Sequence, residues 1–113
     1  MTVYKKGDIV LVPFPFSDQT FVKKRPAVVI SSDVHNGRSM DIVIMAVTSN
    51  TKNPIRIDEC IIKDYNSAGL LKPSVIKPAI STIDKSLVLK KLGNLSSEDL
   101  DLLNKALKEL LAI

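Results

Sequence analysis

PAVVISSDVHNGRSMDIVIMAV, residues 26–47, contains two apolar runs with a polar segment between them. The runs, at residues 26–31 and 42–47, are rich in β-branched side chains and lack polar alternation, which is typical of central strands covered on both faces. The polar segment contains Asn36-Gly37, a dipeptide that favours tight chain reversals. We therefore expect the two runs to pair as an antiparallel hairpin turned at Asn36-Gly37.

Shorter apolar patterns outside this hairpin predict further strands. They lie at residues 9–14, 57–62, 74–83 and 86–92, and residues 66–69 between them read as a loop. The two prolines at positions 13 and 15 end the first of these strands or place it at a sheet edge. A series of short strands of this kind indicates a mainly β fold.

The C-terminal segment predicts an α-helix. Ser96 can cap its start, and Glu98 and Asp99 follow in the first turn, where negative charge suits the helix dipole. Five leucines then recur at helical spacing and form one apolar face: Leu100, Leu103, Leu107, Leu110 and Leu111. Strands followed by one terminal helix suggest a small bent barrel with a helix packed on it.

The composition is that of an ordinary globular protein. With 113 residues, 45% hydrophobic and 25% charged, we expect a single domain spanning residues 1–113. Cys60 is the only cysteine, so no internal disulfide can form, which fits a reducing cytoplasm. No apolar run approaches the roughly 20 residues that a membrane span needs. We expect a cytoplasmic protein that does not associate with membranes.

The charge of the chain is unevenly distributed. The net charge is +4, with a pI near 9.3. Residues 1–95 carry 14 Lys and Arg against 8 Asp and Glu, whereas residues 96–113 carry 2 against 4. A basic body suits a nucleic acid or an acidic protein as partner. Many basic proteins bind neither partner, so basicity alone does not identify a nucleic-acid-binding protein or a protein with an acidic partner.

The predicted hairpin also brings two polar side chains together. Pairing that is symmetric about Asn36-Gly37 places residue i opposite residue 73 − i, so Arg25 falls opposite Thr48. Arg25 precedes Pro26 and should therefore be extended, and its guanidinium offers a planar fork of donors that matches phosphate oxygens. Thr48 and Ser49 add hydroxyl donors. The alternative is that Arg25 pairs with an acid and that Thr48-Ser49 only ends a strand.

Other residues with catalytic or ligand-binding chemistry are few. The sequence has no phosphate-binding glycine loop, dinucleotide fingerprint or zinc motif. His35 reads as an exposed turn residue and Cys60 as a core residue. Asp18 and Gln19 lie in the polar loop that leads to Arg25, where a carboxylate can accept a proton or hold the arginine. The alternative for this loop is simple solvation.

Taken together, five segments resemble the PemK/MazF growth-inhibitor toxins of bacterial toxin–antitoxin modules. Their order and spacing extend over nearly the whole chain. The segments are GDIVLVPFPF at 7–16, KKRPAVVIS at 23–31, TS at 48–49, GLLKPSVIK at 69–77 and ISTIDKSLVLKKLGNLSSEDL at 80–100.

This resemblance implies an SH3-like bent antiparallel barrel with a C-terminal α-helix, acting as a homodimer. It implies sequence-selective cleavage of single-stranded RNA, chiefly messenger RNA, without a metal or other cofactor. In this family the arginine of an Arg-Pro element and the threonine of a Thr-Ser element act in the active site, and they fall on Arg25 and Thr48. A short acidic antitoxin, partly disordered when free, is the expected protein partner.

The remaining roles follow from the same resemblance. Many members carry a Glu-Gln pair shortly before Arg-Pro, but here Asp18-Gln19 lies slightly further from Arg25. Asp18 is the candidate base, and this departure leaves its role open. The expected substrate-binding residues are Gln19, Lys23, Lys24, Ser49, Lys72 and Lys77, with the lysines holding flanking phosphates.

Two other functions are compatible with such a barrel. One is a toxin of the same fold that traps DNA gyrase by a protein–protein contact, often through a C-terminal aromatic residue. This chain ends LLAI and has no tryptophan, which counts against that function. The other is a non-catalytic RNA-binding barrel. The chain has only three phenylalanines and two tyrosines, so a base-stacking surface is poorly supported.

Overall fold

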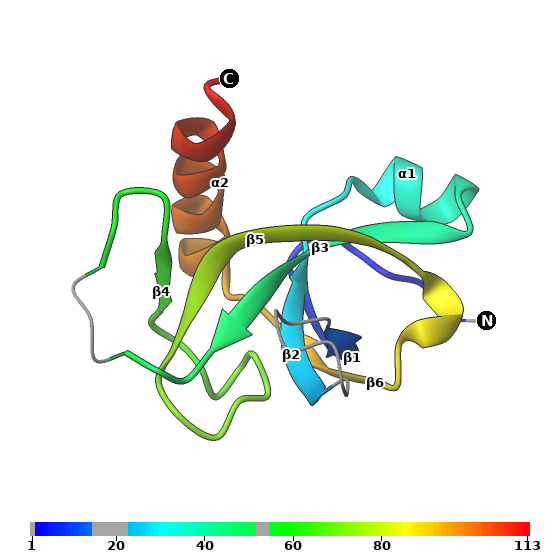
Figure 1. Ribbon diagram of the computed structural model, residues 1–113, viewed down its shortest axis with the longest axis horizontal. Helices are drawn as coiled ribbons and strands as arrows, with labels where there is room; N and C mark the ends of the chain where they lie inside the picture. The colour runs from blue at the N-terminus through cyan, green and yellow to red at the C-terminus, as the bar shows by residue number, and fades with distance from the viewer. Residues whose placement is uncertain (1, 15–22, 52–54) are drawn as a thin grey trace.

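The computed structural model describes residues 2–14, 23–51 and 55–113. In these residues six strands form one antiparallel sheet in the order β4-β5-β3-β2-β1-β6 (Figure 1). The strands are β1 (Asp8–Phe14), β2 (Lys23–Val29), β3 (Asp41–Thr48), β4 (Cys60–Ile62), β5 (Ser74–Asp84) and β6 (Lys90–Asn94). The helices are α1 (Asp33–Arg38), the 3-10 helix η1 (Lys85–Leu87) and α2 (Ser97–Leu111).

The predicted register of the two central strands is confirmed. Ala27 lies opposite Ala46, Val28 opposite Met45 and Val29 opposite Ile44. Each pair obeys the rule that places residue i opposite residue 73 − i. The side chains of these strands alternate between two separate apolar clusters, one on each face of the sheet. Burial on both faces explains why these segments lack polar residues.

The predicted tight turn at Asn36-Gly37 is wrong, because helix α1 makes the connection. Ser32 caps this helix, its side chain accepting a hydrogen bond from the backbone N–H of His35 at 3.1 Å. The Asn36 side chain is buried and donates to the carbonyl oxygens of Tyr4, at 3.2 Å, and Ser31, at 3.1 Å. The local cap and the distant contact to Tyr4 hold Asn36 in a helical turn and override its preference for a hairpin.

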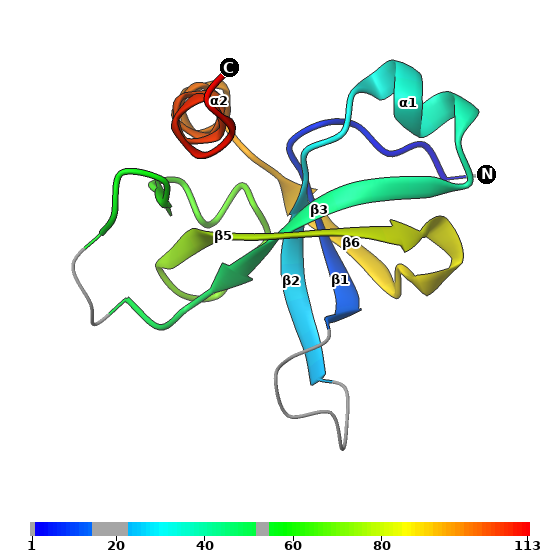
Figure 2. The same ribbon diagram turned by 45° about the horizontal axis from the view of Figure 1, so that its top comes forward.

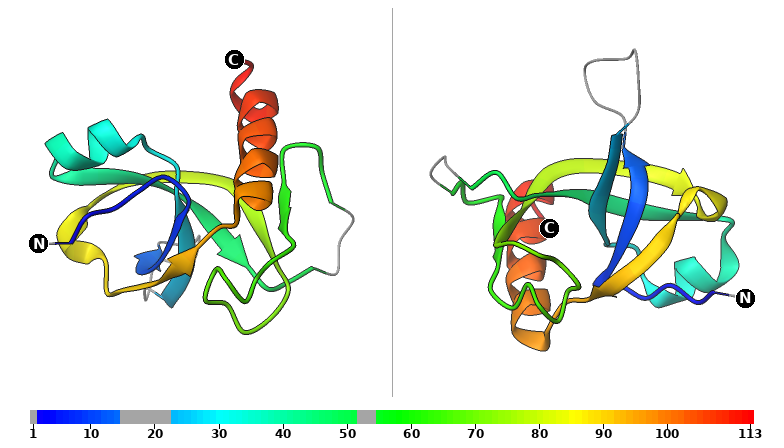
Figure 3. Two further views of the ribbon diagram at one scale, coloured as in Figure 1. Left: turned by 180° about the vertical axis from the view of Figure 1, so that it is seen from behind. Right: turned by 90° about the horizontal axis from the view of Figure 1, so that it is seen from below.

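The sheet is strongly bent, so that β3 and β5 run across β1 and β2 (Figure 2). One face packs against helix α2, which lies beside β4, whereas α1 lies near the other end of the sheet (Figure 3). The second face encloses its own cluster, which includes Val10, Val12, Val29 and Ile44. The expected mainly β architecture, a bent antiparallel barrel with a C-terminal helix, is confirmed.

Two strand predictions need correction. The strand expected at 86–92 begins later, because η1 occupies Lys85–Leu87 and the Asp84 side chain accepts the backbone N–H of Ser86 at 2.8 Å. The strand proper is β6. The strand expected at 57–62 is reduced to β4, since residues 57 and 58 form a turn, after which the N–H of Glu59 donates to the carbonyl of Arg56.

Helix α2 matches its prediction at its start and along most of its length. Ser96 Oγ accepts the backbone N–H of Asp99 at 3.1 Å, as expected of a cap. The Asp99 carboxylate is buried and accepts the N–H groups of Lys63, at 3.0 Å, and Asp64, at 2.9 Å, which ties the helix to the segment after β4. Leu103 and Leu107 are buried, but Leu111 is 50% exposed and lies outside the core.

Gly69 is required by the close approach of its loop to strand β6. Its φ is +76°, and a Cβ atom at this position would lie 2.0 Å from the carbonyl oxygen of Leu92. Neither the positive φ nor this approach is compatible with a side chain. Gly69 therefore sets the position of the segment between β4 and β5, which lines one of the two cavities that contain Arg25.

We expect Gly69→Ala to destabilise the protein by about 2 kcal/mol or more, because the backbone must move away from Leu92. Gly37→Ala is the matched control: this glycine lies in α1, with nothing within 4 Å of the added methyl group. We expect it to stabilise the fold by roughly 0.5 kcal/mol. Urea unfolding midpoints of the two variants test this difference, and equal midpoints would contradict it.

Candidate active site

Arg25 and Thr48 lie together at one end of the β2–β3 pair, as the register predicts. Arg25 is half-buried and lies opposite Val12 of the neighbouring strand β1. Thr48 is the last residue of β3 and is also half-buried. Both line a cavity of about 260 Å³, together with Ala46, Asn50, Lys77 and Ala79. We call this the threonine cavity.

A second cavity of about 260 Å³ adjoins Arg25 on its other side. Ser49 and Lys72 line it with Arg25, and the loop that contains Gly69 forms its far wall. Side chains alternate along a strand, so Thr48 and Ser49 lie in different cavities although they are neighbours in sequence. Arg25 and Val47 line both cavities, and Arg25 is the charged residue that they share; each cavity also has one lysine, Lys77 or Lys72.

The hydroxyl of Thr48 is oriented by the backbone two residues later in the chain. The N–H of Asn50 donates to Thr48 Oγ1 at 3.1 Å. A hydroxyl that accepts in this way still has its own proton to donate. The guanidinium of Arg25 adds donors in a fixed plane. The lining of the cavity thus includes cationic and neutral donors, a combination suited to the oxygens of a phosphate group.

A β-bulge in strand β5 contributes Lys77 and Ala79 to the threonine cavity, beside Arg25 and Thr48. Met45 of β3 lies opposite Ile80 of β5, but Val47 lies opposite Ile76. One residue of β3, Ala46, therefore faces the three residues 77–79 of β5. Pro78 lies inside this bulge, where the lack of an N–H donor costs no ladder hydrogen bond.

Lys77 of this bulge forms an ion pair with Glu59, a residue that the sequence analysis did not select. The Lys77 ammonium donates to a carboxylate oxygen of Glu59, whose other oxygen accepts the backbone N–H of Arg56 at 2.8 Å. These hydrogen bonds, that from Lys77 first, hold the pKa of Glu59 below its ordinary value, so the carboxylate is charged at neutral pH. The available signal was an acidic pair, Asp58-Glu59, directly before the apolar residues 60–62.

Several predicted residues are not placed at these cavities. Asp18 and Gln19 lie outside the described residues. Lys23 and Lys24 are exposed on β2, next to Arg25 in the sequence, but line neither cavity. Of the predicted lysines, the cavities include Lys72 and Lys77.

His35 lies at the wrong end of β3 to act at the cavities. Its Nε2 atom is 3.0 Å from Asp41 Oδ1, and Asp41 begins the strand that Thr48 ends. The Ser39 hydroxyl and then His35 lower the pKa of Asp41 by hydrogen bonding. The prediction of a simple turn residue is therefore wrong, because His35 belongs to α1 and has a carboxylate partner.

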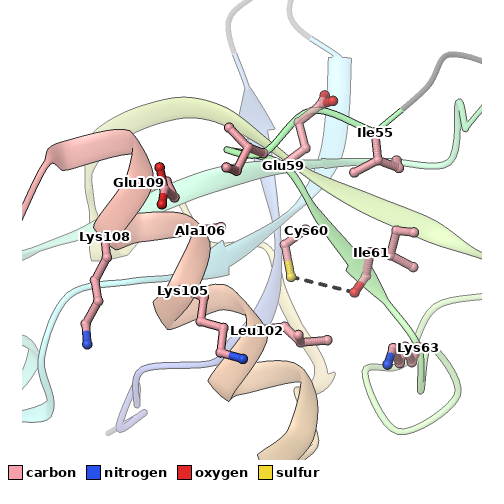
Figure 4. A pocket seen from close by; sticks show the side chains of 11 residues that line it. Ile55, Glu59, Cys60, Ile61, Lys63, Leu102, Lys105, Ala106, Lys108 and Glu109 are labelled. Carbon is pink, nitrogen blue, oxygen red and sulfur yellow. Dashed lines mark hydrogen bonds between the residues drawn. The ribbon is translucent and has the colours of Figure 1, made fainter.

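Cys60 is a core residue, as predicted. Its thiol is buried, and burial raises its pKa to about 11, so it is protonated at neutral pH. Figure 4 shows it facing helix α2 across a larger, mostly apolar cavity of about 560 Å³ between β4 and α2. Arg25 and Thr48 do not line this cavity.

The described residues contain no group of three or more His, Cys, Asp and Glu side chains placed to hold a metal ion. Neither α1 nor α2 has the length and apolar character of a bilayer-spanning helix.

The geometry can be compared with known proteins. Solved structures with a closely similar fold include a mycobacterial endoribonuclease in complex with its cognate antitoxin, with a TM-score of 0.79 and 17% identity over 97% of this chain and 96% of that one. They also include MazF from Deinococcus radiodurans (TM-score 0.77, 22% identity, 100% of both chains) and a MazE–MazF complex from that organism (0.76, 21%, 99% of both chains). At these identities the likeness shows a shared fold.

A search of curated proteins found none that matches the sequence. The family model described as PemK-like, MazF-like toxin of type II toxin–antitoxin system matches residues 5–111. Since this match spans nearly the whole sequence, the chain belongs to the PemK-like, MazF-like toxins of type II toxin–antitoxin systems.

Proposed function

We propose that this protein is an endoribonuclease toxin that cleaves single-stranded RNA at selected sequences and is neutralised by a cognate antitoxin. The observation that carries this proposal is the shared cavity of Arg25 and Thr48 in a member of this toxin family. Two solved relatives of the same fold are described as endoribonucleases. The basic body of the chain suits a polyanionic substrate.

The reaction we propose is an internal transesterification. The ribose 2′-oxygen attacks the adjacent phosphorus, and the bond from phosphorus to the 5′-oxygen breaks, which leaves a 2′,3′-cyclic phosphate and a 5′-hydroxyl. One proton leaves the 2′-hydroxyl and one reaches the 5′-oxygen. The protein must assist both transfers and stabilise the additional negative charge on the phosphorane. No metal ion is needed in this scheme.

Arg25 is the residue proposed to bind the phosphate and stabilise the developing charge. A guanidinium is a poor base, but its planar donors suit two phosphate oxygens at once. Thr48 would donate its hydroxyl proton to a non-bridging oxygen, since its oxygen already accepts from Asn50. Asp18 remains the candidate base by analogy with the family's acidic residue.

Neighbouring nucleotides would continue from this point into the second cavity. There Lys72 and Ser49 are the candidates for the next phosphate. Lys23, Lys24 and Gln19 are the candidates on the β1–β2 side. Such phosphate contacts do not depend on base identity, so sequence selectivity must come from loop contacts to unstacked bases.

The protein partner we propose is a short acidic antitoxin that covers the RNA-binding surface. A basic toxin body and an acidic segment are electrostatically complementary, which accelerates association. Solved relatives of this fold include complexes with a cognate antitoxin and with MazE. A homodimer is the assembly that the family resemblance predicts.

We expect the purified protein to cleave a single-stranded RNA of mixed sequence in EDTA and to leave cyclic or 3′-phosphate ends. Arg25→Ala should lower the single-turnover rate by about 10³-fold or more, and Thr48→Val by about 10²-fold, because each removes a donor from the transition state. Circular dichroism must show both variants folded. DNA gyrase trapping without RNA cutting, or cutting that survives Arg25→Ala, would refute the proposal.

Binding should depend on salt through the exposed lysines of β2. For a non-cleavable 2′-deoxy analogue of the RNA, Lys23→Ala/Lys24→Ala should reduce the slope of log affinity against log salt by about 1.4, roughly 0.7 for each phosphate that the variant no longer neutralises. Lys105→Ala/Lys108→Ala is the matched control, because it removes the same charge from exposed positions of α2. An equal change of slope in both variants would contradict direct phosphate contacts by Lys23 and Lys24, because it would show that only the net charge of the protein matters.

A further inference from the structure

We propose that Lys77, held in place by the buried carboxylate of Glu59, is an additional catalytic cation that contacts the scissile phosphate opposite Arg25. This inference rests on the proposed ribonuclease function and extends it by one substrate contact and one positioning residue. Lys77 touches the substrate in this scheme, whereas Glu59 acts only through Lys77.

The first support is that Lys77 lines the threonine cavity with Arg25 and Thr48. The three side chains come from three adjacent strands: Arg25 from β2, Thr48 from β3 and Lys77 from β5. The β-bulge at residues 77–79 changes the direction of the β5 side chains at this level of the sheet. In a regular ladder one residue of β5 would lie opposite Ala46, whereas here three residues, 77–79, do so.

Small side chains keep the space between these groups open. Ala46 and Ala79 line the same cavity, and neither extends beyond a methyl group. The cavity volume of about 260 Å³ exceeds that of a phosphate group with its attached ribose oxygens. The lining of this cavity therefore offers an entering phosphate a guanidinium, a hydroxyl and an ammonium group.

The second support is the way Glu59 holds Lys77. Cys60 lies opposite Ile76, Ile61 opposite Val75 and Ile62 opposite Ser74. Continuing this register past the end of β4 places Glu59 opposite Lys77, so the two are cross-strand neighbours. Figure 4 shows the Glu59 carboxylate pointing away from helix α2, on the other side of the chain from Cys60 Sγ.

The burial of the two partners is unequal, and this is what a positioning role requires. The Glu59 side chain is 4% exposed, whereas the Lys77 side chain is 37% exposed. A buried carboxylate stays charged only with strong partners, and Glu59 has both the Lys77 ammonium and the Arg56 N–H. The exposed ammonium has three donors, so an anion can share it with Glu59.

The ion pair with Glu59 can make Lys77 stabilise the transition state more than the bound substrate. A phosphodiester carries one negative charge, and the phosphorane formed by 2′-oxygen attack carries an additional one. Because Glu59 competes for Lys77, the attraction to the ground-state phosphate is weakened, whereas the more charged transition state competes better. Interactions that strengthen in this way raise the rate of the chemical step more than they raise affinity.

The test compares Lys77→Met with Lys91→Met under single-turnover conditions with saturating RNA. The pairs are matched: Lys91 Nζ lies 3.1 Å from the carboxylate of Asp8, with side chains 43% and 5% exposed. Lys91 lies on β6 and lines neither cavity. We expect Lys77→Met to lower the cleavage rate about 10²-fold and RNA affinity less than tenfold. Lys91→Met should cleave at nearly the wild-type rate.

Two further variants separate catalysis from packing. Lys77→Arg keeps the charge and should recover at least tenfold of the missing rate, whereas Glu59→Gln should lower the rate with a smaller effect on affinity. A wild-type rate for Lys77→Met, an equal loss in Lys91→Met, or a loss confined to affinity overturns the inference. If wild-type protein does not cut RNA at all, the proposed function fails, and this inference fails with it.

Discussion

The antiparallel pairing of β2 with β3 is the constraint on which the candidate site depends. Both strands are buried on both faces, and a slip of one residue would move every side chain to the opposite cluster. The register is therefore held by the whole core rather than by the connection between the strands. Its consequence is chemical: the first polar residue before one buried segment, Arg25, meets the first polar residue after the other, Thr48.

The pairing of β5 with β3 adds what the central pair lacks. Its β-bulge at residues 77–79 interrupts an otherwise regular sheet and forms one wall of the threonine cavity. The bulge also leaves a lysine beside a buried glutamate, an arrangement that apolar residues could replace without loss of stability. In the proposed scheme, the value of this ion pair lies in the ammonium group that it presents to the substrate.

Much of this molecule could be predicted from local sequence patterns. The central strands, the cap of α2 and its buried leucines follow from periodicity and burial. The register was predicted from symmetry about Asn36-Gly37, and it holds for the observed pairs although helix α1 occupies the connection. The errors occur where distant contacts override local preference. Asn36-Gly37 favours a tight turn, but hydrogen bonds from Asn36 to Tyr4 and Ser31 hold it in a helix.

The sequence by itself determined the family, the pairing of the two central strands and the two side chains at their open end, because these depend on apolar patterning and motif spacing along the chain. Only the tertiary structure decided which side chains share a cavity. It separated Thr48 from Ser49, left Lys23 and Lys24 outside both cavities, and joined Lys77 to Glu59 across two strands. The physical reason is that a bulge and a cross-strand ion pair depend on how strands β3, β4 and β5 meet, which no local pattern records.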